Sequence, residues 1–187
     1  MKAIGVVGSP RKGGNTEILT KHALQAIKEE GIATELVRLA GLDIRPCNAC
    51  KICRKEERCP IDDDLFPLYK KLKEFDAIIL STPVYFASAS AQIKAFMDRA
   101  GYIAVRKRVF AGKVGGPLVV ARRAGKSFTF AELMFWFHYN GFYMPGSTYW
   151  NVAIGRDKGE VRQDQEGLTT AWNFGKNIAF LVKKLKA

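Results

Sequence analysis

Side chains that build hydrolytic or acid–base catalytic sites are scarce in this sequence. Its 187 residues include only 2 histidines, and neither His22 nor His138 has a ligand-type neighbour three or four positions away. Acidic residues are also in deficit, because 18 aspartates and glutamates face 30 lysines and arginines, for a formal net charge of +12. No catalytic nucleophile or acid–base pair is apparent in the sequence, and a reaction carried by a cofactor would need none. The positive charge favours an anionic cofactor, an acidic protein partner or nucleic acid.

Long apolar runs are missing as well. The most apolar stretch, residues 128–144, contains Glu132, His138 and Asn140, and no stretch reaches the ~20 apolar residues of a membrane span. Residues 1–7 lead directly into a turn and do not have the pattern of a secretory signal. A cytoplasmic protein with no membrane partner is expected, and its thiols should stay reduced. No nucleic-acid-binding motif accompanies the basic residues, so no nucleic-acid partner is expected.

Apolar segments of strand and helix periodicity alternate along the chain. The pattern predicts strands at 2–7, 34–39, 77–80, 114–121 and 148–154, and helices at 16–30, 64–74, 89–100, 127–139 and 167–184. Five strands alternating with five helices predict one α/β domain over residues 1–187, with a flavodoxin-like, doubly wound, five-stranded parallel sheet in the order 2-1-3-4-5. Ligands of such sheets bind beyond the carboxyl ends of the strands.

A glycine-rich loop follows the first predicted strand and precedes a helix. Its backbone N–H groups and the positive end of the helix dipole favour a phosphate. The loop has neither Gly-Lys-Ser/Thr nor Gly-x-Gly-x-x-Gly, which favours a single terminal phosphate over ATP or a pyrophosphate. The alternative is a plain polar turn in which Asn15 or Thr16 caps the helix. The candidate phosphate ligands are Ser9, Arg11, Lys12, Gly13, Gly14, Asn15 and Thr16.

Two segments together resemble a known family. The run from Gly8 to Thr16, and the run Ser81-Thr82-Pro83-Val84-Tyr85-Phe86 with the helical residues 91–99 after it, are similar to the NADPH-dependent FMN reductase and iron–sulfur flavoprotein group. The resemblance covers most of the chain. It implies that FMN binds with its phosphate on the first loop and its ring against the second.

The ring site is expected at the ends of the third and fourth strands. Pro83 fixes the second loop, and the residues after it supply apolar and aromatic surface, although Tyr85 and Phe86 are equally compatible with an ordinary core. The loop after the fourth strand is the third wall, but Arg122-Arg123-Ala124 departs from the glycine-rich pattern of the family. The candidate ring contacts are Thr82, Pro83, Val84, Tyr85, Phe86, Arg122 and Gly125.

All four cysteines lie in a connection at residues 40–63, which is far longer than the usual ~2–6 residues. The spacing Cys47-x2-Cys50-x2-Cys53-x5-Cys59 begins like a bacterial ferredoxin run. A structural zinc is the main alternative, although zinc knuckles usually stand further apart, and free or redox-active thiols are another. The resemblance implies that the four cysteines bind a 4Fe–4S cluster.

The resemblance also implies a function. It implies an electron-transfer oxidoreductase that takes electrons from an acidic low-potential carrier such as ferredoxin and passes them to a small-molecule acceptor. The cations near the cysteines suit such a donor. An NAD(P)H-dependent FMN reductase with a structural cluster is the nearest alternative, and a zinc-containing basic binding protein is an alternative of another class.

Two further patterns carry structural expectations. Asp62, Asp63 and Asp64 are best explained as acidic residues at a helix N-terminus, where they complement the dipole. Aromatic residues between Phe128 and Tyr143 recur too often for one helical face. They predict a subunit interface in a homodimer or homotetramer, with a deep core as the alternative.

Overall fold

A parallel sheet forms the centre of the computed structural model, which describes residues 1–187. Its main strands are β1 (Lys2–Val7), β2 (Ala33–Arg38), β3 (Ala77–Tyr85), β5 (Val114–Ala121) and β6 (Val152–Ile154), in the order β2-β1-β3-β5-β6. This is the flavodoxin-like order expected from the sequence, with one addition. The short β4 (Ser88–Ala89) pairs antiparallel with the end of β3 and lies outside the parallel series.

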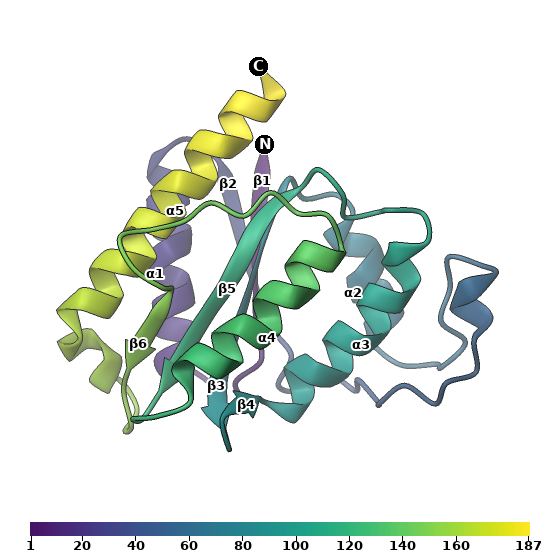
Figure 1. Cartoon of the computed structure of the whole chain (residues 1–187), viewed down its shortest axis with the longest axis horizontal. Coiled ribbons are helices and arrows are strands. Elements are labelled where there is room, and N and C mark those ends of the chain that lie inside the picture. Colours follow the sequence, from purple (N-terminus) through teal and green to yellow (C-terminus); the bar gives the residue numbers. More distant parts are fainter.

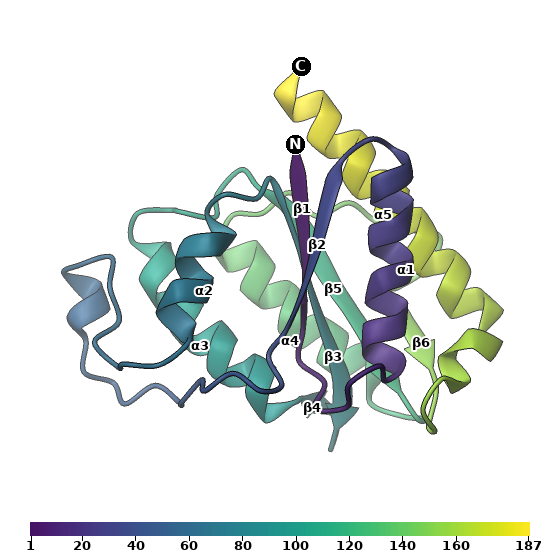
Figure 2. The ribbon, with the colours of Figure 1, turned by 180° about the vertical axis from the view of Figure 1, so that it is seen from behind.

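Helices cover both faces of the sheet (Figure 1, Figure 2). One face carries α1 (Asn15–Glu29) and α5 (Gln165–Lys186), and the other carries α2 (Leu65–Leu72), α3 (Ala91–Val105) and α4 (Lys126–Tyr139). The two cores follow from this layering. Leu19, Phe174 and Ile178 belong to the first core, whereas Phe96 and Phe137 belong to the second. Continuous apolar strands such as β5, which is buried along its whole length, are typical of a sheet covered on both faces.

The boundaries differ from the sequence expectation mainly at the ends of strands. β3 continues to Tyr85, five residues past the expected end, because its last residues pair with β4 as a hairpin. The last strand is shorter than the expected 148–154, because only residues from Val152 onward pair with β5. The short 3₁₀ helices η1 (Ile52–Arg54) and η2 (Glu160–Gln163) were not expected.

The aromatic stretch divides between core and surface. Phe137 and Phe142 are buried and stack edge-on, with ring centroids 4.8 Å apart. Phe128, Phe135 and Tyr139 are instead 76%, 73% and 74% exposed. Their spacing of seven and four residues places them on one stripe of α4. A core explanation therefore accounts for only part of the stretch.

The cysteine-containing segment 40–63 projects from the sheet beside α2 and α3 (Figure 1, Figure 2). Apart from η1, it contains no helix or strand. No helix in the chain has both the length and the apolar character that crossing a membrane would require.

Candidate functional site

The three expected flavin loops meet at one pocket at the carboxyl ends of β1, β3 and β5. The pocket has a volume of about 270 Å³. It is lined by Ser9, Arg11, Asn15 and Thr16 of the first loop, Pro83, Val84 and Tyr85 of the second, Arg122 of the third, and Val120, Gly155 and Arg156. The last three were not expected from the sequence. Lys12, Gly13, Gly14, Thr82, Phe86 and Gly125 do not line the pocket.

Free hydrogen-bond donors gather where the first loop lines this pocket. Helix α1 begins at Asn15, and the residue before it, Gly14, provides no side-chain cap. The backbone N–H groups of Asn15 and Thr16 therefore have no acceptor within the chain. Gly13 adopts φ +64°, a conformation that favours glycine and turns the loop into the helix. An anion would satisfy these donors and interact with the helix dipole.

A buried acid fixes the shape of the same loop. Glu17 accepts a hydrogen bond of 2.7 Å from the backbone N–H of Gly13 and pairs with Lys21 at 2.7 Å. Burial alone would raise the pKa of Glu17, but Lys21, the Gly13 N–H and Arg38 outweigh burial and lower it. Glu17 is therefore held as a carboxylate. Its role was not visible in the sequence, because an acid in a first helical turn is common.

The segment after β6 packs against the glycine-rich first loop. The Asn15 Nδ2 atom donates to the carbonyl of Asp157 at 2.8 Å, and its Oδ1 atom accepts from the N–H of Gly159 at 2.8 Å. Arg11 Nη1 donates to the carbonyl of Arg156 at 3.2 Å. A Cβ atom at Gly155 would lie 2.7 Å from Asn15 Nδ2, so glycine permits this approach. The Asn15 side chain thus joins two loops, and its backbone N–H is the group left for a ligand.

A tight hairpin carries the aromatic residues of the second loop. Phe86 and Ala87 both adopt positive φ, +50° and +61°, as the two central residues of a type I′ hairpin turn require. Non-glycine residues in this conformation are strained, and such strain concentrates at functional sites. The Phe86 side chain is fully exposed. A Cβ atom at Gly125 would lie 2.8 Å from the Ala87 Cα atom, so the third loop packs directly behind the hairpin.

Thr82 lies behind the pocket wall. Its buried hydroxyl donates to the carbonyl of Pro83 at 2.9 Å and accepts from the N–H of Ser90 at 3.0 Å. The Ser90 hydroxyl in turn donates to the carbonyl of Gly8. This chain of bonds ties the second loop to the first, so Thr82 positions the flavin loops and does not face the pocket.

A second, smaller cavity is surrounded by all four cysteines. Cys47, Cys50, Cys53 and Cys59 line a space of about 20 Å³ together with Arg99, Tyr102 and Ile103 of α3. Ala49 and Lys51 adopt positive φ, which turns the chain back on itself between the first three cysteines. No three cysteine, histidine or carboxylate side chains reach the spacing that a single metal ion requires. The thiols therefore surround a space without forming a closed site for one ion.

Burial and the neighbouring sulfurs disfavour an unliganded thiolate at Cys53 in this cavity. Burial raises the pKa of the Cys53 thiol, and the neighbouring sulfurs of Cys47 and Cys50 raise it further. Metal ions would remove this penalty, because they bind thiolates and offset their mutual repulsion. The donor set, four thiols and no oxygen or imidazole ligand, fits an iron–sulfur cluster.

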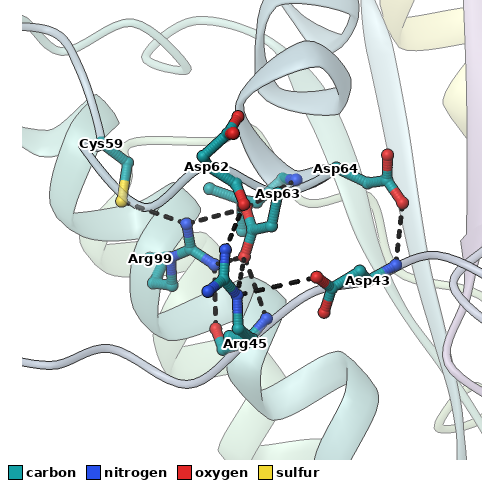
Figure 3. A network of polar contacts seen from close by, with 8 residues as sticks. Asp43, Arg45, Cys59, Asp62, Asp63, Asp64 and Arg99 are labelled. Carbon is teal, nitrogen blue, oxygen red and sulfur yellow. Dashed lines mark hydrogen bonds and ion pairs between the residues drawn. The ribbon is translucent and has the colours of Figure 1, made fainter.

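A buried ion pair anchors the fourth cysteine (Figure 3). The Arg99 side chain donates to both carboxylate oxygens of Asp63, and its Nη2 atom also donates to Cys59 Sγ at 3.1 Å. Burial would raise the pKa of Asp63, but Arg99 and the backbone N–H groups of Arg45 and Leu65 outweigh burial and lower it. The bond to the Leu65 N–H, at the first residue of α2, agrees with the expected helix N-terminus. The partnership with Arg99 was missed.

A basic surface borders the cysteines. The loop contributes the exposed cations Lys51, Arg54, Lys55 and Arg58, and the turn directly after α3 contributes Arg106, Lys107 and Arg108. Arg106 donates to the carbonyl of Arg54, and Lys107 lies 3.8 Å from Glu57. Two groups of cations that are far apart in the sequence therefore form one surface, hereafter the basic patch.

The model of the NADPH-dependent FMN reductase family matches residues 1–157. The chain belongs to this family. Within the family it groups with the iron–sulfur flavoproteins: it is 40% identical to one from Methanocaldococcus jannaschii over the full length of both chains. It is 34% identical to another from Methanosarcina thermophila, covering 100% of this chain and 97% of that one. The fold is similar to that of a WrbA-like flavodoxin from Agrobacterium tumefaciens, with a TM-score of 0.69, 19% identity and 98% coverage of each chain.

Membership of the family fixes the class of chemistry. The chain is a flavin-dependent oxidoreductase, as the sequence predicted. The pocket lining contains no cysteine, histidine, lysine or carboxylate, which is consistent with this class, because the cofactor carries the chemistry and the protein supplies binding and orientation.

Proposed function

We propose that this oxidoreductase holds FMN in the pocket at the strand ends and a 4Fe–4S cluster on its four cysteines. In this proposal it takes electrons from an acidic low-potential protein such as ferredoxin and delivers them to a small-molecule acceptor. A cluster exchanges one electron at a time, whereas FMN accepts one or two, so the pair converts single electrons into pairs. The observation that carries the proposal is the gathering of all four thiols around one cavity beside the basic patch.

The free N–H groups at the start of α1 support the FMN assignment. A terminal phosphate would satisfy the donors of Asn15 and Thr16. Arg122 lines the same pocket, and a cation there would stabilise the negative charge of a reduced flavin. The pocket and the apolar edge of Tyr85 suit a phosphate at one end and a planar ring at the other.

The basic patch supports an acidic donor. Positive surface around a redox centre raises the rate at which an acidic partner docks, and the effect weakens with salt. Lys55→Gln combined with Lys107→Gln should slow reduction by ferredoxin at low ionic strength. The matched control is Lys28→Gln combined with Lys184→Gln, which removes the same charge from exposed positions on α1 and α5. Equal rates in the two double variants would contradict the docking site.

The relative placement of the two sites bears on electron transfer. Their pockets share no residue. Helix α3 begins beside the flavin hairpin at Ala91 and meets the cysteine cavity at Arg99 and Tyr102. At 1.5 Å per residue, this stretch of helix spans about 12–17 Å. Assembly of subunits through the exposed stripe on α4 offers a second route, in which the cluster of one chain serves the flavin of its neighbour.

The decisive variant is Cys59→Ser. It should remove or weaken the cluster and leave FMN bound, because the flavin pocket contains no residue of the cysteine loop. Reduction by ferredoxin should then slow by a large factor, while photochemical reduction of FMN persists. Pro60→Ala is the control, because it changes the next residue and keeps all four thiols. Ferredoxin reducing the cluster-free variant as fast as the parent would contradict the proposal.

The family match also favours an alternative function. The matching family is described as NADPH-dependent, so the chain is alternatively an NAD(P)H-dependent FMN reductase in which the cluster is structural. Rapid reduction of the bound flavin by NADPH, with the same rate in the Cys59→Ser variant, would support this second function.

A further inference from the structure

Arg99 is a deeply buried charged side chain that contacts a cysteine. It is 2% exposed, and it comes from an otherwise apolar face of α3 that includes Phe96, Ala100 and Ile103. Its two terminal nitrogens donate to Asp63, to the carbonyl of Arg45 at 2.9 Å and to Cys59 Sγ at 3.1 Å. One side chain therefore connects a core helix, the loop backbone and a candidate cluster ligand.

Stability alone is a weak explanation for this pair. Removing two charges from water is costly, and buried ion pairs can often be replaced by apolar residues without loss of stability. The Nε atom of Arg99 also finds no hydrogen-bond partner, which adds to the cost. The pair instead fixes the orientation of the Arg99 guanidinium. Asp63 is itself held by the N–H groups of Arg45 at 3.0 Å and Leu65 at 3.2 Å, so the guanidinium plane is fixed toward Cys59.

The four cysteine sulfurs differ in the hydrogen bonds that they accept. Among the hydrogen bonds to the cysteine sulfurs, Cys59 receives the one from a charged side chain. Cys47 accepts only the backbone N–H of Ala49, at 3.4 Å. Hydrogen bonds to cysteine sulfur help to set the potential of an iron–sulfur cluster, and bonds from a charged donor are roughly twice as strong as neutral ones.

We propose that Arg99 is a positioning residue of the cluster site: its N–H groups hold the Cys59 thiolate and raise the reduction potential of the cluster. This inference rests on the proposed function, because it requires a cluster on the four cysteines. Reduction adds one electron and no proton to the cluster, and the added negative charge is shared by its thiolates. A donor fixed on one sulfur therefore stabilises the reduced form more than the oxidised form.

The test separates the directed hydrogen bond from net charge. Arg99→Lys keeps the positive charge and the pair with Asp63, but a single ammonium group lacks the second arm that reaches Cys59. We expect this variant to fold, retain its iron and have a reduction equilibrium constant at least tenfold lower, which is about 59 mV for one electron. The control is Arg106→Met. It removes a whole charge from the residue that follows the same helix, and its contact with the loop is to the Arg54 carbonyl, not to sulfur.

A second variant covers the case in which lysine does not fit. Arg99→Met combined with Asp63→Asn removes one charge of each sign, leaves net charge unchanged and keeps an acceptor for the loop backbone. It should lower the reduction equilibrium constant by a similar factor. The measurement is a dithionite titration of the anaerobically purified, cluster-loaded protein, followed by the electron paramagnetic resonance signal of the reduced cluster, with iron analysis of each sample.

The outcomes separate a failure of the proposed function from a failure of the role given to Arg99. A parent protein without iron would contradict the proposed function, and this inference with it. Iron-containing Arg99 variants with the parent potential, or a larger shift in Arg106→Met than in Arg99→Lys, would overturn the inference and leave the proposed function intact. Loss of iron from both Arg99 variants would make the residue a structural anchor alone and would also overturn the inference.

Discussion

Replacing FMN by riboflavin removes only the phosphate and so tests the first loop directly. The structure leaves the N–H groups of Asn15 and Thr16 without acceptors at the start of α1. A hydrogen bond to a charged group contributes about 1.5–3 kcal/mol. Losing two such bonds should weaken binding by about 3–6 kcal/mol, or roughly 150-fold to 20,000-fold. The assay is quenching of flavin fluorescence during titration of the apoprotein with each ligand.

A hydroxyl variant localises the effect. Thr16→Val removes a donor at the helix start and should weaken FMN by about 10-fold to 100-fold while leaving riboflavin binding unchanged. Thr20→Val is the control, because the Thr20 hydroxyl donates to the Thr16 carbonyl and contacts Ser81 instead of the pocket. Equal affinity for FMN and riboflavin in the parent protein would refute the phosphate loop.

Three further predictions concern assembly, pH and packing. Phe135→Glu should convert the expected dimer or tetramer to a monomer in light scattering, whereas the exposed Phe180 of α5 is the control and Phe180→Glu should leave the assembly intact. A parent protein with the 20.8 kDa mass of a single chain in dilute solution would contradict the interface. The folded-state pKa of Glu17 is lowered, so its contribution to stability is present above its unfolded pKa and is lost as pH falls through the folded value. Glu17→Gln should therefore reduce stability to urea at pH 7, and the difference from the parent should shrink as the pH is lowered. Gly125 has a positive φ, and Gly125→Ala would place a Cβ atom against Ala87, so this variant should lower the unfolding free energy by about 1–3 kcal/mol and weaken FMN binding. An unchanged melting temperature would refute this close packing.

The sequence specified the fold well because its signals are local. Continuous apolar strands alternate with amphipathic helices, and this pattern alone leads to the doubly wound sheet. Boundaries were least accurate where pairing is tertiary. The extension of β3 to Tyr85 depends on the hairpin with β4, and the late start of β6 depends on where it meets β5.

The site was predictable to the extent that its loops follow strands. Ser9, Pro83 and Arg122 line one pocket because the carboxyl ends of parallel strands meet at one edge. Arg156 was not found, because the segment after β6 has no motif and reaches the pocket only through its bonds to Arg11 and Asn15. Arg99 was missed for a similar reason. The one available signal was a charged residue on an apolar helical face, and its partner lies 36 positions away.

The central claim is that one chain carries both a flavin and an iron–sulfur cluster. It is tested most directly by an anaerobic absorbance spectrum of the purified protein with iron, zinc and flavin analysis. We predict a yellow-brown protein with about four iron atoms and about one FMN per chain and no stoichiometric zinc. A colourless protein with about one zinc per chain would contradict the account and favour the basic binding protein.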